Sequence, residues 1–233
     1  PEVSHDTLPA QWQGLSIYSK GNSDAAILDS FRQRDLYFLS ENGMNFARVL
    51  LSFTSLRYPD YPEDGSQVNV AELQNLDQMV AWAMEYDIHI SLCMISPPGY
   101  AQGEDGDAQS VGEESWPDAE RWALIGDYWT MLARRYADIP TKNLSFELCA
   151  EWGAQDSALI EDFTRQWRAI VEELRAISPD RVLLASFDTA RADKLPLAEA
   201  MAAMGVSLAA HPYYPAELWY FSTEQRVEMI FDV

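Results

Sequence analysis

Polar side chains suited to acid–base chemistry recur where apolar segments of this chain come to an end. The candidates are Arg48 inside the second segment, Ser96 at the end of the third, Glu151 after the fourth, and His211 and Tyr213 at the sixth. An arginine inside an apolar strand is costly unless it is paired, so Arg48 should have a carboxylate partner. Glu151 is either a solvated acid at a strand end or a catalytic carboxylate. If the segments are neighbouring strands, these side chains converge on one pocket.

The segments that must position these side chains are six short apolar runs. They are predicted to be strands at residues 14–18, 46–52, 88–95, 144–149, 182–187 and 206–210. The runs are continuous rather than alternating, which is typical of strands covered on both faces. Between them, stripes with helical spacing predict helices around residues 73–83, 125–136, 160–177 and 195–204. Asn69 and Glu72 have capping-box spacing before the first of these helices, and Gly205 is a predicted C-cap after the last.

Alternating strands and helices predict a parallel sheet with right-handed crossovers. The segment after the first strand, "YSKGN", is no Gly-rich phosphate loop. Its absence argues against a Rossmann fold and favours a (β/α)8 TIM barrel. About six strand–helix units are visible, so we expect residues 1–233 to form one barrel domain that lacks strands seven and eight. The long segments 54–68 and 97–115 follow strands and belong on the catalytic face. The second is either a mobile surface loop or a cleft wall carrying Tyr100 and Trp116.

The charge balance limits the partners that this chain can bind. It has 37 acidic against 16 basic residues and a net charge of −21, which repels nucleic acid and anionic membranes. No apolar run approaches the roughly 20 residues that span a bilayer. The chain starts at Pro1 without a basic and apolar leader, so we expect a processed or trimmed chain. A lysine-poor acidic surface also fits salt adaptation.

Cysteines and histidines give no framework for a metal or cofactor. Cys93 and Cys149 both lie in apolar runs, which favours buried free thiols over a single disulfide. The 3 histidines are His5, His89 and His211, and no two of them have ligand spacing. We therefore expect no metal and no cofactor, which disfavours a metal-dependent barrel hydrolase.

Five segments carry a resemblance to glycoside hydrolase family 5, the cellulase-type family of clan A. They are "QGLSI", "NGMNFARVLLSF", "CMISPPGY", "LSFELCAEWG" and "HPYYP", the last two being similar to the family patterns F-E-L-x-N-E-P and H-x-Y-x-P. The resemblance covers nearly the whole chain. It implies a (β/α)8 barrel and retaining hydrolysis of a β-linked polysaccharide or oligosaccharide, with catalytic carboxyl groups roughly 5 Å apart. It also implies a secreted or extracellular protein without a cofactor.

The resemblance assigns a role to each matching residue. Glu151 becomes the general acid/base, Arg48 holds and tunes the nucleophile, and His211 and Tyr213 orient the acid/base and the sugar. Trp152 is a candidate for stacking on a sugar ring, as are Trp116 and Trp219, although ordinary packing explains each of these tryptophans equally well.

Other positions depart from the family pattern while keeping their expected place in the substrate site. Ala150 stands where the family has Asn, Trp152 where it has Pro, and Ser96 where it has His. The family's nucleophile comes from a seventh strand, and Glu217, Glu224 and Glu228 follow the sixth strand too closely. Two interpretations stay open. The chain is an incomplete retaining glycosidase, whose barrel a partner or missing segment completes, or it is a non-catalytic glycan-binding protein derived from the same barrel.

Overall fold

Strands and helices alternate along the chain in the computed structural model, which describes residues 11–17, 32–53, 56, 68–96, 119–150, 157–188 and 195–211. The strands are β1 (Gly14–Ile17), β2 (Phe46–Ser52), β3 (His89–Ser96), β4 (Leu144–Ala150), β5 (Val182–Asp188) and β6 (Ser207–His211). The helices are α1 (Gln33–Glu41), α2 (Val70–Glu85), α3 (Ala119–Arg135), α4 (Ser157–Ile177) and α5 (Leu195–Ala203). The predicted strands are therefore confirmed, with ends that shift by one residue at most.

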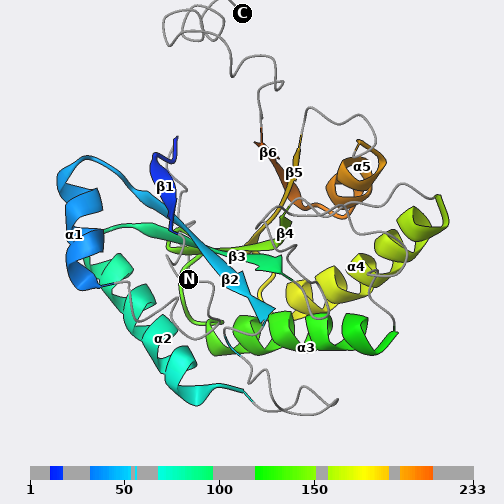
Figure 1. The fold of residues 1–233 in the computed structure, drawn as a ribbon, viewed down its shortest axis with the longest axis horizontal. Helices are drawn as coiled ribbons and strands as arrows, with labels where there is room; N and C mark the ends of the chain where they lie inside the picture. Colours follow the sequence, from blue (N-terminus) through cyan, green and yellow to red (C-terminus); the bar gives the residue numbers. More distant parts are fainter. Residues whose placement is uncertain are drawn as a thin grey trace, which may run out of the picture.

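The six strands form one sheet whose spatial order follows the sequence, β1-β2-β3-β4-β5-β6, and every neighbouring pair is parallel. Figure 1 shows the strands in the middle of the molecule, with helices α1 to α5 around the outside. A parallel sheet in sequence order, with a helix between each two consecutive strands, is the wall of a (β/α)8 barrel. The predicted fold class is confirmed, and the described residues contribute six of its strands.

The two faces of the sheet bury different kinds of side chain. On the outer face, apolar residues such as Val49, Leu92 and Phe146 join one large cluster with the helices. On the inner face, a small cluster of Leu50, Cys93 and Ala150 is accompanied by buried polar and charged groups. Neighbouring residues of a strand point to opposite faces, so the apolar runs contribute to both faces, and polar residues such as Ser91 and Glu147 interrupt them on the inner one.

The ends of the helices follow the predicted signals where the structure describes them. The side chain of Asn69 accepts a hydrogen bond from the backbone N–H of Glu72 at 3.2 Å and caps α2. Gly205 follows α5 with a φ of 71°, the left-handed conformation that glycine adopts without strain. These two residues fix where α2 starts and where α5 gives way to β6.

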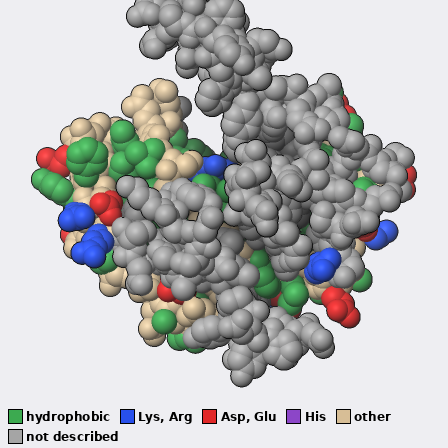
Figure 2. Space-filling model, viewed as in Figure 1, with side chains coloured by type: hydrophobic (Ala, Val, Ile, Leu, Met, Phe, Trp, Pro, Cys, Tyr) green, Lys and Arg blue, Asp and Glu red, His purple; other side chains and the backbone are tan. Residues whose placement is uncertain are grey.

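Helix α1 was not predicted from its sequence. It buries Leu36 and Leu39, but the intervening Tyr37 and Phe38 are 50% and 61% exposed. Residues 36–39 are all apolar, so the sequence shows no helical spacing, although only Leu36 and Leu39 are buried. Figure 2 shows hydrophobic side chains gathered on the surface at the place where Figure 1 draws α1 and β1.

A bulge interrupts β4 close to its carboxyl end. The register of β4 against β5 shifts between Glu147 and Ala150. Strict alternation would place Cys149 with Glu147 on the inner face, but Cys149 packs in the large outer cluster and Ala150 in the small inner one. The bulge therefore turns Ala150 inward directly before Glu151 in the sequence.

Candidate active site

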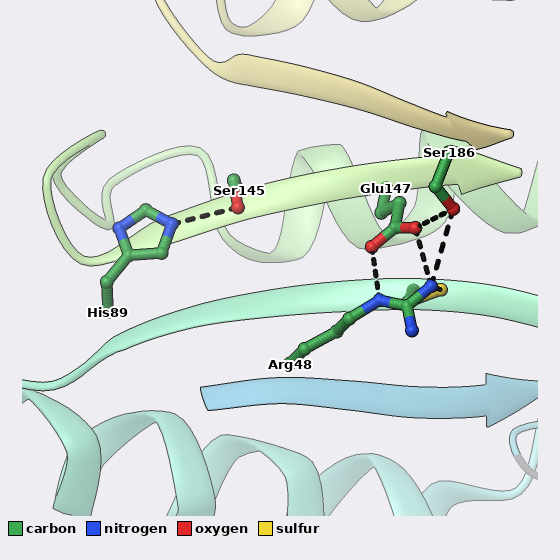
Figure 3. A network of polar contacts seen from close by, with 6 residues as sticks. Arg48, His89, Ser145, Glu147 and Ser186 are labelled. Carbon is green, nitrogen blue, oxygen red and sulfur yellow. Dashed lines mark hydrogen bonds and ion pairs between the residues drawn. The ribbon is translucent and has the colours of Figure 1, made fainter. Parts of the chain in front are cut away.

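Arg48 forms a two-pronged ion pair with Glu147 on the inner face of the sheet. Its Nε donates to Oε2 of Glu147 at 2.6 Å and its Nη2 donates to Oε1 at 2.6 Å. Figure 3 shows the guanidinium of Arg48 facing the carboxylate of Glu147. The predicted carboxylate partner of Arg48 is confirmed, and it comes from β4.

Two further side chains complete this group. Nη2 of Arg48 also contacts Sγ of Cys93 at 3.2 Å and Oγ of Ser186 at 3.4 Å, and the Ser186 hydroxyl donates to Oε1 of Glu147 (Figure 3). We call Arg48, Cys93, Glu147 and Ser186 the central ion-pair network. Its members come from β2, β3, β4 and β5, so one arginine side chain connects four adjacent strands, which are spaced roughly 4.8 Å apart.

Exposure differs between the two charged partners. The side chain of Glu147 is 3% exposed and that of Arg48 is 17% exposed, so the arginine forms the accessible side of the pair. Burial, reinforced by the charge of Glu147, raises the pKa of the Cys93 thiol well above its usual value. Cys93 therefore stays a neutral thiol and contributes packing and a weak acceptor rather than a nucleophile.

A second buried polar group lies at the amino ends of the same strands. We call Trp12, His89 and Ser145 the amino-end histidine group. Nδ1 of His89 lies 2.8 Å from the carbonyl oxygen of Lys142, and Nε2 lies 2.8 Å from Oγ of Ser145. Since a carbonyl only accepts, Nδ1 carries the proton and Nε2 accepts from Ser145. Figure 3 shows the His89–Ser145 contact at a distance along β4 from Glu147.

Burial sets the charge of this histidine. His89 is 2% exposed, and the ring of Trp12 lies against it with centroids 4.2 Å apart. Desolvation by burial lowers the pKa of His89 to about 4 and outweighs the hydrogen bond to Lys142, which raises it. His89 is therefore neutral at neutral pH, which suits a structural role.

The predicted site residues divide into those that the structure describes and those that it does not. Arg48 and Ala150 both lie on the inner face, where Ala150 is 6% exposed. The backbones of Ser96 and His211 end β3 and β6, while their side chains lie outside the described part of the chain. The remaining predictions also lie outside it: Glu151, Trp152 and Tyr213, together with Tyr100, Trp116 and Trp219.

Glu147 and Ser186 were missed as site residues. The signal was present, because Glu147 and Arg48 are both charged residues inside apolar strands. Nothing in the sequence pairs them, since β2 and β4 are separated by β3 and only a long side chain reaches across. Ser186 carried no signal, as a single serine in an apolar strand is common.

Both cysteines are free and buried, so the preference for free thiols is confirmed and the alternative of a disulfide is wrong. Among the described residues, no three His, Cys, Asp or Glu side chains are grouped so that they could hold a metal ion. No helix in the described segments has the length and apolar character needed to cross a membrane.

Comparison with known families identifies the fold family. The model of "Cellulase (glycosyl hydrolase family 5)" matches residues 3–214. The chain belongs to glycosyl hydrolase family 5. This confirms the resemblance that the strand motifs carry, and it covers every element that positions the central ion-pair network.

Individual relatives of this family 5 chain are more distant. Endoglucanase C of Acetivibrio thermocellus is 26% identical over 165 residues, which cover 69% of this chain and 41% of that protein. A protein of Aspergillus fumigatus named "Probable glucan 1,3-beta-glucosidase A" is 25% identical over 174 residues, covering 73% and 38%. A solved trimodular endoglucanase of subfamily 4 of family 5 shares the fold with a TM-score of 0.66 and 17% identity, covering 94% of this chain and 43% of that one. The chain thus spans about two fifths of the length of these relatives.

Proposed function

We propose that this protein hydrolyses β-linked glucans by the retaining mechanism, with Glu151 as general acid/base. The observation that carries the proposal is the family 5 match over residues 3–214. Relatives named as an endoglucanase and as a glucan 1,3-beta-glucosidase support a β-glucan as substrate. The inner face supports it as well, because Arg48 has the paired setting that a functional cation needs.

In the proposed mechanism, Glu151 protonates the leaving glycosidic oxygen while a second carboxylate attacks the sugar. Glu147 is not that second carboxylate. Its side chain is 3% exposed, and both of its oxygens accept hydrogen bonds from Arg48. We propose that the nucleophile comes from a seventh strand, as the family pattern implies, and that a further segment or a partner supplies this strand to a single barrel domain around residues 1–233.

The two outermost strands of the described sheet support such completion. Leu15 of β1 is 42% exposed and Leu208 of β6 is 47% exposed. Edge strands with uncovered apolar side chains favour pairing with further strands. We propose an extracellular location for the enzyme, since a polymeric glucan does not cross a membrane intact.

The test compares the wild-type protein with Glu151→Gln on carboxymethylcellulose, laminarin, mixed-linkage glucan and aryl β-glucosides. Loss of a general acid should lower kcat by about 100-fold to 10,000-fold on the substrate that the wild type cleaves. Glu172→Gln, an exposed acid on α4, is the matched control and should match the wild type. Equal rates for wild type and Glu151→Gln would sink the acid/base assignment.

A non-catalytic glycan-binding protein is the second candidate, and Ala150 is the observation that favours it. The family pattern has Asn at this position, whereas the methyl group of Ala150 donates no hydrogen bond. Loss of one oriented donor costs about 2–4 kcal/mol of transition-state stabilisation. This candidate predicts saturable binding of cello-oligosaccharides in calorimetry without turnover on any of the four substrates.

A further inference from the structure

The central ion-pair network is built in a way that fixes the plane of one guanidinium. Two parallel N–H···O bonds from Nε and Nη2 of Arg48 to Glu147 allow one relative orientation of the two planar groups. The Ser186 hydroxyl donates to Oε1 of Glu147, which fixes the carboxylate in turn. Glu147 on β4 thus orients Arg48, and Ser186 on β5 orients Glu147.

Stability alone does not account for this arrangement. Glu147 and Ser186 are 3% and 0% exposed, so the acid side of the network is desolvated, while Arg48 stays 17% exposed. Replacing a buried ion pair by apolar side chains of similar volume is often neutral or stabilising. What the pair supplies, and apolar side chains cannot, is a cation in a defined orientation on the inner face.

The cation is oriented toward the side of the sheet where chemistry is expected. Arg48 is the more exposed partner, with Glu147 behind it, and Ala150 ends β4 on the same face. Glu151 follows Ala150 directly in the sequence. A fixed guanidinium near this strand end is suited to holding a reacting carboxylate or a developing negative charge in place.

We propose that Glu147 and Ser186 are positioning residues for the hydrolytic reaction, acting through Arg48 rather than on the substrate. The inference rests on the proposed function. It assigns no proton transfer to Glu147, and it predicts that the two residues affect kcat far more than KM. A change in substrate binding is not expected, because neither side chain is accessible enough to touch a sugar.

The kinetic test is a double-mutant cycle of Arg48→Lys and Glu147→Gln in the full protein, together with the segment or partner that supplies the nucleophile. Each single variant should lower kcat by about 10-fold to 100-fold with KM within threefold, since small misplacements in an active site have effects of this size. If Glu147 acts only through Arg48, the double variant should be no slower than the slower single variant. Losses that multiply in the double variant would overturn the inference.

Two less disruptive variants, both at Ser186, test the inference even if Glu147→Gln misfolds. Ser186→Ala removes the hydroxyl that donates to Glu147, and Ser186→Thr retains one. We expect Ser186→Ala to lower kcat by about threefold to 10-fold and Ser186→Thr to recover most of it. Ser145→Ala is the matched control, because it removes a buried serine bond on the same face of β4 in the amino-end histidine group. An equal kcat for Ser186→Ala and wild type would contradict the proposal.

A measurement without turnover separates this inference from the proposed function. The Nε–H resonance of Arg48 in ¹⁵N-labelled protein should be protected from exchange in the wild type and in Ser145→Ala, and should broaden or vanish in Glu147→Gln. If the wild type cleaves no glucan but this pattern holds, the proposed function fails while Glu147 still positions Arg48. If the resonance is unchanged in Glu147→Gln, the positioning role is wrong whatever the activity.

Discussion

The inner face of the sheet carries two buried polar groups that are built on different principles. The central ion-pair network joins a cation and an acid from β2 and β4. The amino-end histidine group holds a neutral ring between a backbone carbonyl, a serine and the ring of Trp12. The ring nitrogens of His89 and the charged groups of the network all have hydrogen-bond partners, yet only the network contains charges that were taken out of water (Figure 3).

The central ion-pair network serves to orient a cation, whereas the amino-end histidine group serves stability. Burying a neutral polar group costs little free energy when its hydrogen bonds are made. The amino-end histidine group can therefore stabilise the amino ends of the strands. A buried ion pair gains little net free energy over apolar packing. In a TIM barrel the carboxyl ends of the strands carry the chemistry and the amino ends carry stability, and the two groups are distributed accordingly.

The largest effect is expected when one partner of the ion pair is removed. Arg48→Met leaves the carboxylate of Glu147 buried and unpaired, which should lower the free energy of unfolding by about 3–5 kcal/mol. The double variant Arg48→Met/Glu147→Leu removes both charges and should return to within about 1 kcal/mol of the wild type. Urea unfolding of the three proteins measures both quantities. A double variant as unstable as the single one would mean that the pair is a stabilising element after all.

A buried arginine, Arg181, offers a contrast with the partly exposed Arg48. Arg181 is 4% exposed and donates to the carbonyl oxygens of Leu144, Tyr136 and Ile139 at 2.8–3.0 Å. Desolvation lowers its pKa to about 10, so it remains charged at neutral pH. Its bonds tie the end of α3 to β4, which indicates a structural role at the amino end of the strands.

Arg181→Lys should therefore lower stability without altering turnover. A lysine cannot reproduce the fork of donors to separate carbonyl groups, so we expect a loss of about 3 kcal/mol in the free energy of unfolding. The value of kcat at a temperature well below unfolding should stay within twofold of the wild type. Arg48→Lys is the matched variant, for which we expect a lower kcat. Comparable kcat losses in both would remove the distinction between the two ends of the barrel.

The fold could be predicted from the sequence because the outer face controls it. Strands such as β2, predicted over residues 46–52, are continuous apolar runs, and their covering helices have clear stripes. Helix α1 was not predicted because Tyr37 and Phe38 are apolar yet exposed. A pattern argument assumes that apolar residues are buried, and it fails where they are not.

The site could be predicted in part. Arg48 was identified because a charge inside an apolar strand demands a partner, but the identity of that partner depends on a side chain crossing β3. Such reach is a property of three-dimensional spacing and leaves no local sequence pattern. The bulge that turns Ala150 inward was equally hidden, since it changes alternation without changing residue type.

The pH dependence of stability should report the amino-end histidine group. His89 has a pKa of about 4 in the folded protein against an ordinary value of 6.5, so the unfolded chain takes up its proton first as the pH falls. Its contribution to stability is complete above pH 6.5 and is lost progressively down to about pH 4. The shift corresponds to a loss of at most about 3 kcal/mol. Other acids titrate here too, so the quantity to compare is the difference between wild type and His89→Gln.

The variant should be less stable than the wild type at neutral pH, and its stability should fall less steeply between pH 6.5 and 4. Unfolding by urea at half-unit pH steps gives both curves. Parallel curves would show that His89 titrates normally in the folded protein and is not held neutral by burial.

The smallest effect is expected from Ser145→Ala, which removes the hydroxyl that donates to Nε2 of His89. One neutral buried hydrogen bond contributes about 1 kcal/mol, so the free energy of unfolding should fall by that amount and kcat should not change. The ¹⁵N shift of Nε2 should move as its donor disappears, while that of Nδ1 stays in place because its bond to Lys142 remains. A kcat loss in this variant as large as that of Ser186→Ala would mean that any disturbance of the inner face slows turnover, and the central ion-pair network would then have no special position in the barrel.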